Sequence, residues 1–128
     1  MSLMETADDL RLVKESILLP VVMDVLEVDI KKLSSASLKM PIVYVEILKS
    51  LQNMVIADMY QNRLKLRKHG IKVYEQRRTK DCLEATYLCR GYHHKISLMW
   101  GLVKSDIQVI LYKYIGINST GENVMTTT

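Results

Sequence analysis

The chain has 128 residues, the length of one ordinary domain, and a formal net charge of +4 at pH 7. Hydrophobic residues make up 48% of it and charged residues 25%, which excludes a disordered chain and is typical of a globular protein. No uncharged apolar run approaches the ~20 residues that span a bilayer, and the N-terminal residues are acidic, so we expect a cytoplasmic protein without a membrane segment.

The first predicted element is a helix over residues 7–33. Thr6 and Asp9 stand at the spacing of a capping box, in which a hydroxyl accepts from an early backbone N–H. Apolar residues then recur at helical spacings of three and four, at Leu10, Val13, Ile17, Val21, Val25 and Val28. Pro20 interrupts this series, and a proline inside a helix removes one backbone hydrogen bond. We therefore predict one helix kinked at Pro20, with two separate helices as the alternative.

A serine-rich linker at residues 34–37 separates this helix from a second one, predicted over residues 41–69. Pro41 suits the first turn of a helix, because its missing N–H would have no intrahelical partner there. Gly70 is expected to end the helix, and cations fill the preceding turn, where they suit the negative end of the helix dipole. Residues 71–74 follow as a short extended connector.

A third helix is predicted over residues 79–115. Thr79 is its expected N-cap, and Gly116 is expected to close it. One helical stripe joins Cys82, Ala85, Thr86, Cys89, His93, Ile96, Trp100, Val103, Ile107, Ile110 and Tyr114. Gly91 and Gly101 lie inside this helix, where each costs about 1 kcal/mol relative to alanine.

The fold class that follows is all-α: a three-helix up-down bundle, or a four-helix bundle if Pro20 splits the first helix. We expect a single helical domain over residues 1–116 and a disordered polar tail over residues 117–128. The predicted helices would be ~40–55 Å long, whereas a compact domain of this length has a radius of gyration of only ~14 Å. The helices therefore either bend or extend beyond the core, and exposed helix ends favour a homo-oligomer.

Aromatic residues mark a candidate interface on the third predicted helix. Trp and Tyr are favoured both in bundle cores and in dimer interfaces, so both uses stay open. The interface candidates are Trp100, Tyr92, Tyr112 and Tyr114.

Charge is unevenly distributed along the chain. Residues 1–30 hold seven acids and two bases (−5), whereas residues 31–80 hold twelve bases and three acids (+9). The cations are densest in residues 63–80, and a patch of this density neutralises several phosphates of a nucleic acid. The candidate nucleic-acid-binding residues are Arg63, Arg67, Lys68, Lys72, Arg77, Arg78 and Lys80. Alternatively, these cations are solvated or pair with the acidic first helix, within one chain or across a dimer.

Cys89 and His93 stand four residues apart, a spacing at which two side chains on one helix face share a metal. No second Cys or His pair completes a four-ligand site, and cysteines on an apolar stripe are more often core residues. We therefore expect no metal, no other cofactor and no catalytic residues.

Together these features favour a non-enzymatic protein-interaction or regulatory module that is homo-oligomeric. A nucleic-acid-binding protein using residues 63–80 is the first alternative, and a metal-dependent enzyme using Cys89 and His93 is a more distant one. In size and composition the chain resembles small helical proteins of bacteria and their phages. This resemblance covers no defined motif and implies no residue roles.

Overall fold

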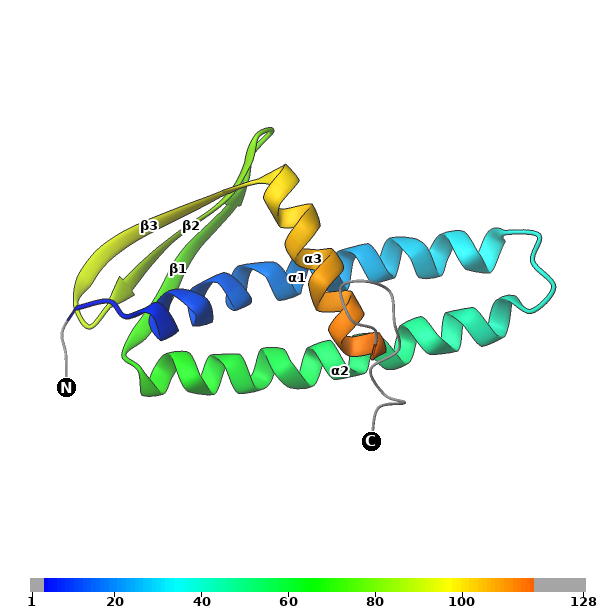
Figure 1. Ribbon diagram of the computed structural model, residues 1–128, viewed down its shortest axis with the longest axis horizontal. Helices are drawn as coiled ribbons and strands as arrows, with labels where there is room; N and C mark the ends of the chain where they lie inside the picture. Colours follow the sequence, from blue (N-terminus) through cyan, green and yellow to red (C-terminus); the bar gives the residue numbers. More distant parts are fainter. Residues whose placement is uncertain (1–3, 117–128) are drawn as a thin grey trace.

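Residues 71–99, mostly predicted as part of a third helix, form three strands, so the protein has an α+β fold and the predicted all-α bundle is wrong. The computed structural model describes residues 4–116 (Figure 1). Its elements in chain order are α1 (Ala7–Ser35), α2 (Pro41–Lys68), β1 (Ile71–Arg78), β2 (Cys82–Cys89), β3 (Tyr92–Met99) and α3 (Trp100–Ile115). No helix in this described range has both the length and the apolar character needed to cross a membrane. The predicted tail, residues 117–128, lies outside the described residues.

Helix α1 begins where the capping box predicts. The Thr6 hydroxyl accepts from the Asp9 N–H at 3.1 Å, and Asp9 Oδ2 accepts from the Thr6 N–H at 2.9 Å. The helix continues through Pro20, with Leu19 and Val21 buried on either side of it. The alternative of two helices is therefore wrong. An interior proline lowers the stability of a helix by about 3 kcal/mol. Burial of each Leu or Val contributes about 1.5–3 kcal/mol, so the buried residues on both sides of Pro20 offset this cost.

Helix α2 also forms where it is predicted, with Pro41 in its first turn and Gly70 just beyond its end. Gly70 has a φ of +71°, and a Cβ added there would lie 3.0 Å from Arg90 Cγ. Both constraints favour glycine, so the helix ends here and the chain turns directly into β1.

The three strands form one antiparallel sheet in the order β1-β2-β3. Residues of the central strand, β2, alternate between a buried face that packs on the helices and a half-buried outer face. The buried residues are Leu83, Ala85, Tyr87 and Cys89. The sequence of this strand also fits a helix, since Cys82, Ala85 and Cys89 are three or four residues apart. A short apolar run can match both the alternation of a strand and the spacing of a helix. The helix predicted over residues 79–115 is wrong for this reason, and only its last part, α3, is helical.

Two turns build the hairpins that replace the predicted helix. Arg90 and Gly91 form a two-residue loop between β2 and β3, with φ values of +49° and +89°. Positive φ at both positions is typical of a type I′ turn, whose twist matches that of paired strands. Thr79, predicted as a helix N-cap, instead closes the β1–β2 turn, where its hydroxyl accepts from the Cys82 N–H at 3.0 Å.

Gly91→Ala is expected to lower the free energy of unfolding by about 1–2 kcal/mol, because an L side chain is strained at a φ of +89°. Gly101→Ala is the matched control, since Gly101 lies in the first turn of α3 with open space around an added Cβ. This control is expected to raise the free energy of unfolding by about 0.5–1 kcal/mol. Urea denaturation measures both changes. In a continuous helix both replacements would stabilise, so stabilisation by Gly91→Ala would contradict the hairpin.

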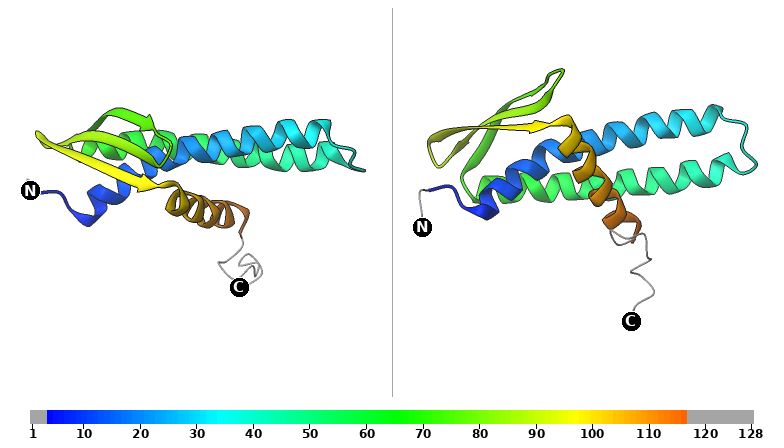
Figure 2. Two further views of the ribbon diagram at one scale, coloured as in Figure 1. Left: turned by 90° about the horizontal axis from the view of Figure 1, so that it is seen from above. Right: turned by 45° about the horizontal axis from the view of Figure 1, so that its top comes forward.

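The sheet covers one end of the α1–α2 hairpin, and α3 crosses the hairpin near its middle (Figures 1 and 2). The inner face of the sheet packs on the first half of α1 and the second half of α2. Buried residues of this core include Val13, Ile17, Leu66, Tyr87 and Leu83. Beyond α3, toward the loop at residues 36–40, no third element of the described chain covers the two helices (Figure 1).

Candidate functional site

The seven cations predicted to bind nucleic acid do not form one patch. Arg77 and Arg78 on β1 are engaged in ion pairs: Arg77 Nη2 lies 3.0 Å from Glu84 Oε1, and Arg78 Nη2 lies 2.7 Å from Asp24 Oδ2. Asp24 belongs to α1, so one contact between the acidic first helix and the basic segment forms within the chain. The other five cations form no ion pair with any residue in the range 4–116.

Three of these five cations line a cleft between α1, α2 and β1, with a volume of about 560 Å³. Arg63 and Arg67 are one turn apart on the same face of α2, and Lys72 belongs to β1. We call this site the basic cleft. Its neutral polar residues are Ser16, Asn62 and Gln76, and its apolar residues are Leu19, Pro20, Met59, Leu66, Ile71 and Val73. Lys68 and Lys80 lie outside this lining.

The basic cleft has three positive charges and no carboxylate among its lining residues. The helix dipole accounts for cations in the last turn of α2, which include Arg67 and Lys68. It does not account for Arg63, which lies more than a turn from the helix end, or for Lys72, which lies in a strand. Like charges gathered without a counter-charge make the cleft attractive to anions.

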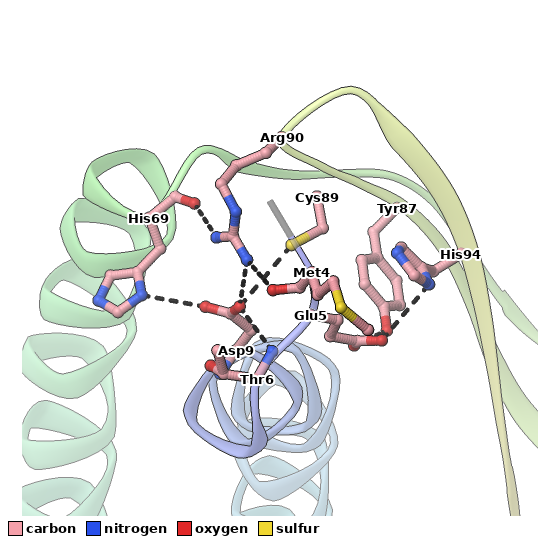
Figure 3. Close-up of polar contacts among 9 residues, drawn as sticks. All are labelled: Met4, Glu5, Thr6, Asp9, His69, Tyr87, Cys89, Arg90 and His94. Atoms are coloured by element: carbon pink, nitrogen blue, oxygen red, sulfur yellow. Dashed lines mark hydrogen bonds and ion pairs between the residues drawn. The ribbon is translucent and has the colours of Figure 1, made fainter. Parts of the chain in front are cut away.

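A second polar site surrounds Asp9 at the start of α1 (Figure 3). Asp9 is 1% exposed, and its carboxylate accepts from Arg90 Nη2 at 2.7 Å and from His69 Nδ1 at 3.1 Å. Arg90 also donates to the His69 carbonyl at 2.8 Å and to the Met4 carbonyl at 2.6 Å. We call this site the Asp9 cluster: Met4, Thr6, Asp9, His69, Cys89 and Arg90. It joins the start of α1, the end of α2 and the β2–β3 turn.

The Asp9 cluster has the electrostatics of a structural site. Hydrogen bonding from Arg90 holds the pKa of Asp9 well below its usual range, against the opposing effect of burial. The Cys89 thiol lies 3.8 Å from Asp9 Oδ2, and burial raises the pKa of this thiol. A nucleophilic cysteine needs a lowered pKa, and a carboxylate acting as a general base at neutral pH needs a raised one. The pKa shifts of Asp9 and Cys89 are therefore both opposite to those that these catalytic roles need.

Tyr87 and His94 extend these polar contacts across the sheet (Figure 3). The Tyr87 hydroxyl donates to Glu5 Oε1, and His94 Nδ1 lies 3.4 Å from Glu5 Oε2. The rings of Tyr87 and His94 stack with their centroids 5.3 Å apart. Burial, together with the Glu5 carboxylate, raises the pKa of Tyr87. These contacts hold the segment before α1 against the sheet.

Cys89 and His93 do not share a face, as a metal site on one helix would require. Cys89 is fully buried on the inner face of the sheet, whereas His93 is exposed on β3, with its Nδ1 3.1 Å from the Tyr74 hydroxyl. Within residues 4–116, no three Cys, His, Asp or Glu side chains are grouped to hold a metal. The spacing that suggested a metal-dependent enzyme has no structural basis, because both residues lie in strands and not on a helix face.

The structure brings together only two of the four aromatic residues predicted as an interface, since Trp100 and Tyr112 line one apolar groove between α1 and α3. Tyr92 is exposed beside the β2–β3 turn, while Trp100 begins α3 and donates from Nε1 to a carbonyl of the β1–β2 turn at 2.7 Å. Tyr112 and Tyr114 are half-buried near the end of α3. The Tyr114 hydroxyl donates to Asp58, so it joins α3 to α2 within the chain.

Large apolar side chains are exposed at the free end of the α1–α2 hairpin, beyond α3. Their exposed fractions run from 40% at Leu38 to 75% at Ile42. We call this surface the hairpin tip: Val28, Leu38, Met40, Ile42, Val43, Tyr44 and Ile47. Ile30 and Val45 are buried in the same part of the hairpin, so the two helices already have an inner contact without the tip residues.

Sequence reasoning missed most of these sites. The sequence indicates Asp9 only as part of a helix cap. The burial of Asp9 depends on Arg90, which lies 81 positions away. Glycine after Arg90 is a turn signal that could have indicated the hairpin. No local sequence pattern indicates that α1 and β1 meet at the basic cleft, because this contact depends on how the sheet packs on the helices.

The comparison with protein families matches residues 4–119 to the family described as YhjD protein. None of the curated proteins matches the chain, and none of the solved structures does. The family match covers nearly the whole chain and all six helices and strands of the described range. The chain therefore belongs to the YhjD protein family.

Proposed function

We propose that this protein is a non-enzymatic, cytoplasmic interaction module that self-associates through the hairpin tip. The observation that supports this proposal is the exposure of seven large apolar side chains where two helices have no third layer. Large apolar side chains gathered at one exposed end of a molecule are typical of protein interfaces. Two cysteines, neither of them in a disulfide, suit a reducing compartment.

A second copy of the chain is the proposed partner because the charge around the hairpin tip is self-compatible. Residues 24–50 hold four acids (Asp24, Glu27, Asp29 and Glu46) and four bases (Lys31, Lys32, Lys39 and Lys49). Two such ends therefore approach without net repulsion, although the whole chain carries +4. Two hairpins packed side by side with twofold symmetry form a four-helix arrangement that covers part of this exposed apolar surface.

Replacing Ile42 and Ile47 together by aspartate is expected to convert a dimer into a monomer. Each buried isoleucine contributes about 1.5–3 kcal/mol, and twofold symmetry places four of them in the interface. The loss of at least about 6 kcal/mol corresponds to an affinity reduced on the order of 10⁴-fold. Size-exclusion chromatography with light scattering at micromolar concentration measures the mass.

Val109→Asp is the matched control, because Val109 is a 58% exposed apolar residue on α3, outside the hairpin tip. The control protein is expected to remain a dimer. A monomeric wild-type protein would contradict the proposed self-association. A dimer that Val109→Asp dissociates, and that the Ile42 and Ile47 replacements leave intact, would place the interface on α3.

Nucleic-acid binding by residues 63–80 is the second candidate function. Six cations of this segment form no ion pair with any described residue, which favours this function, while the ion pairs of Arg77 and Arg78 reduce the charge available. About five phosphate contacts would produce a slope of roughly −4 to −5 for log affinity against log salt concentration. Charge-reversal variants on two faces of α2 separate this candidate from binding of a small molecule.

A further inference from the structure

The basic cleft has a size, a charge and a lining that self-association through the hairpin tip does not use. Its volume of about 560 Å³ falls within the ~300–1,000 Å³ of small-molecule sites. Its three cations have no acidic partner among residues 4–116. We propose that the basic cleft binds a phosphorylated small molecule, with the phosphate held by Arg63 and Arg67.

The arrangement of the cations suits a phosphate monoester. Arg63 and Arg67 stand four residues apart, so their side chains are neighbours on one face of α2. Lys72 borders the cleft from β1, where it pairs with Leu88 on the outer face of the sheet, so the two guanidinium groups of α2 are the main cations of the cleft. Guanidinium groups bind phosphate oxygens through paired N–H donors. A phosphate monoester carries about −1.5 to −2 at pH 7, which these groups neutralise.

The apolar lining indicates that the ligand has a body beyond its phosphate. Half of the twelve lining residues are apolar, and they come from all three elements: Leu19 and Pro20 from α1, Met59 and Leu66 from α2, and Ile71 and Val73 from β1. Inorganic phosphate leaves this surface in contact with water. A ring or an alkyl group attached to the phosphate removes it from water, which is favourable in proportion to the apolar area covered.

Pro20 leaves one backbone carbonyl of α1 without its usual helical donor. Because proline has no N–H, the Ser16 carbonyl has no donor four residues later in α1. Ser16 and Pro20 both line the cleft.

Three probes test the proposal with the full chain at low salt, by isothermal titration calorimetry. Phenyl phosphate combines a phosphate with an apolar ring, inorganic phosphate lacks the ring, and a 20-nucleotide single-stranded DNA presents phosphates along a backbone. Phenyl phosphate is expected to bind saturably and about tenfold more tightly than inorganic phosphate.

Matched double variants locate the binding. Arg63→Glu with Arg67→Glu removes two cations of the cleft, whereas Lys65→Glu with Lys68→Glu makes the same change in net charge on another face of α2, outside the cleft lining. The first variant is expected to weaken phenyl phosphate binding at least about tenfold, and the second by no more than about twofold. Gln76→Trp, which fills the cleft without changing its charge, is expected to weaken binding as the first variant does.

Three results would overturn the proposal. The first is no saturable binding of phenyl phosphate by the folded wild-type protein. The second is an equal loss of binding in both double variants. The third is tight DNA binding that both double variants weaken equally while phenyl phosphate does not bind, which assigns these cations to a nucleic-acid backbone. Circular dichroism shows that each variant is folded before it is titrated.

Discussion

Asp9→Ala is expected to lower the free energy of unfolding by about 3–5 kcal/mol, a large fraction of the stability of a domain this size. The Asp9 carboxylate is 1% exposed and its partner Arg90 has a side chain only 12% exposed. The replacement therefore leaves a largely buried guanidinium without its counter-charge. It also removes the capping-box bond to the Thr6 N–H. Urea denaturation at neutral pH measures the change.

Asp8→Ala is the control for this prediction, because Asp8 is the neighbouring acid in the same helical turn. Its ion pair with Arg11 has an N–O distance of 3.4 Å, and both side chains are more than 70% exposed. An exposed pair of this kind contributes about 0–1 kcal/mol. Equal and small losses for the two replacements would show that Asp9 and Arg90 do not form a buried pair.

Asp9 also makes the stability of the protein depend on pH. Its pKa is lower in the folded protein than in the unfolded chain, because Arg90 stabilises the charged form. The pair therefore stabilises the fold above the unfolded pKa of about 4, and this contribution is lost as the pH falls below that value. The difference in stability between the wild-type protein and Asp9→Ala is expected to shrink between about pH 5 and pH 3. A difference that stays constant over this range would contradict the lowered pKa.

Leu83→Ala is expected to lower the free energy of unfolding by about 2–5 kcal/mol. Leu83 is 1% exposed on the inner face of β2, where it packs in the core formed by the sheet and helices α1 and α3. Truncating it loses apolar burial and leaves a cavity that the surrounding side chains fill only in part. Chemical denaturation followed by circular dichroism measures the loss.

Leu88→Ala is the matched control, since Leu88 is the same residue type in the same strand but on the outer face. It is half-buried, so we expect a loss of about 1 kcal/mol or less. A larger loss of stability at Leu83 than at Leu88 is expected if alternate side chains of β2 point to opposite faces of the sheet. Comparable losses at the two positions would contradict a strand with one buried face.

The candidate sites were predictable only in part. The concentration of cations in residues 63–80 is visible in the sequence, and Arg63, Arg67 and Lys72 of that segment line the basic cleft. Which of them are paired is not visible there. The opposite charges of the first helix and this segment indicate a possible pairing but not its partners, and the structure pairs Arg78 with Asp24.

The sequence by itself determined α1 and α2, because their signals act over a few residues. The Thr6–Asp9 capping box, Pro41 in a first turn and Gly70 at a positive φ each depend only on the local backbone. Tertiary structure decided the rest. The segment from Cys82 to Cys89 satisfies both the helical and the strand period, so its conformation depends on pairing with β1 and β3 and on burial against the helices. The Asp9–Arg90 pair and the basic cleft follow from that packing, because a strand gains its stability from neighbours that are distant in sequence, whereas a helix closes its hydrogen bonds within itself.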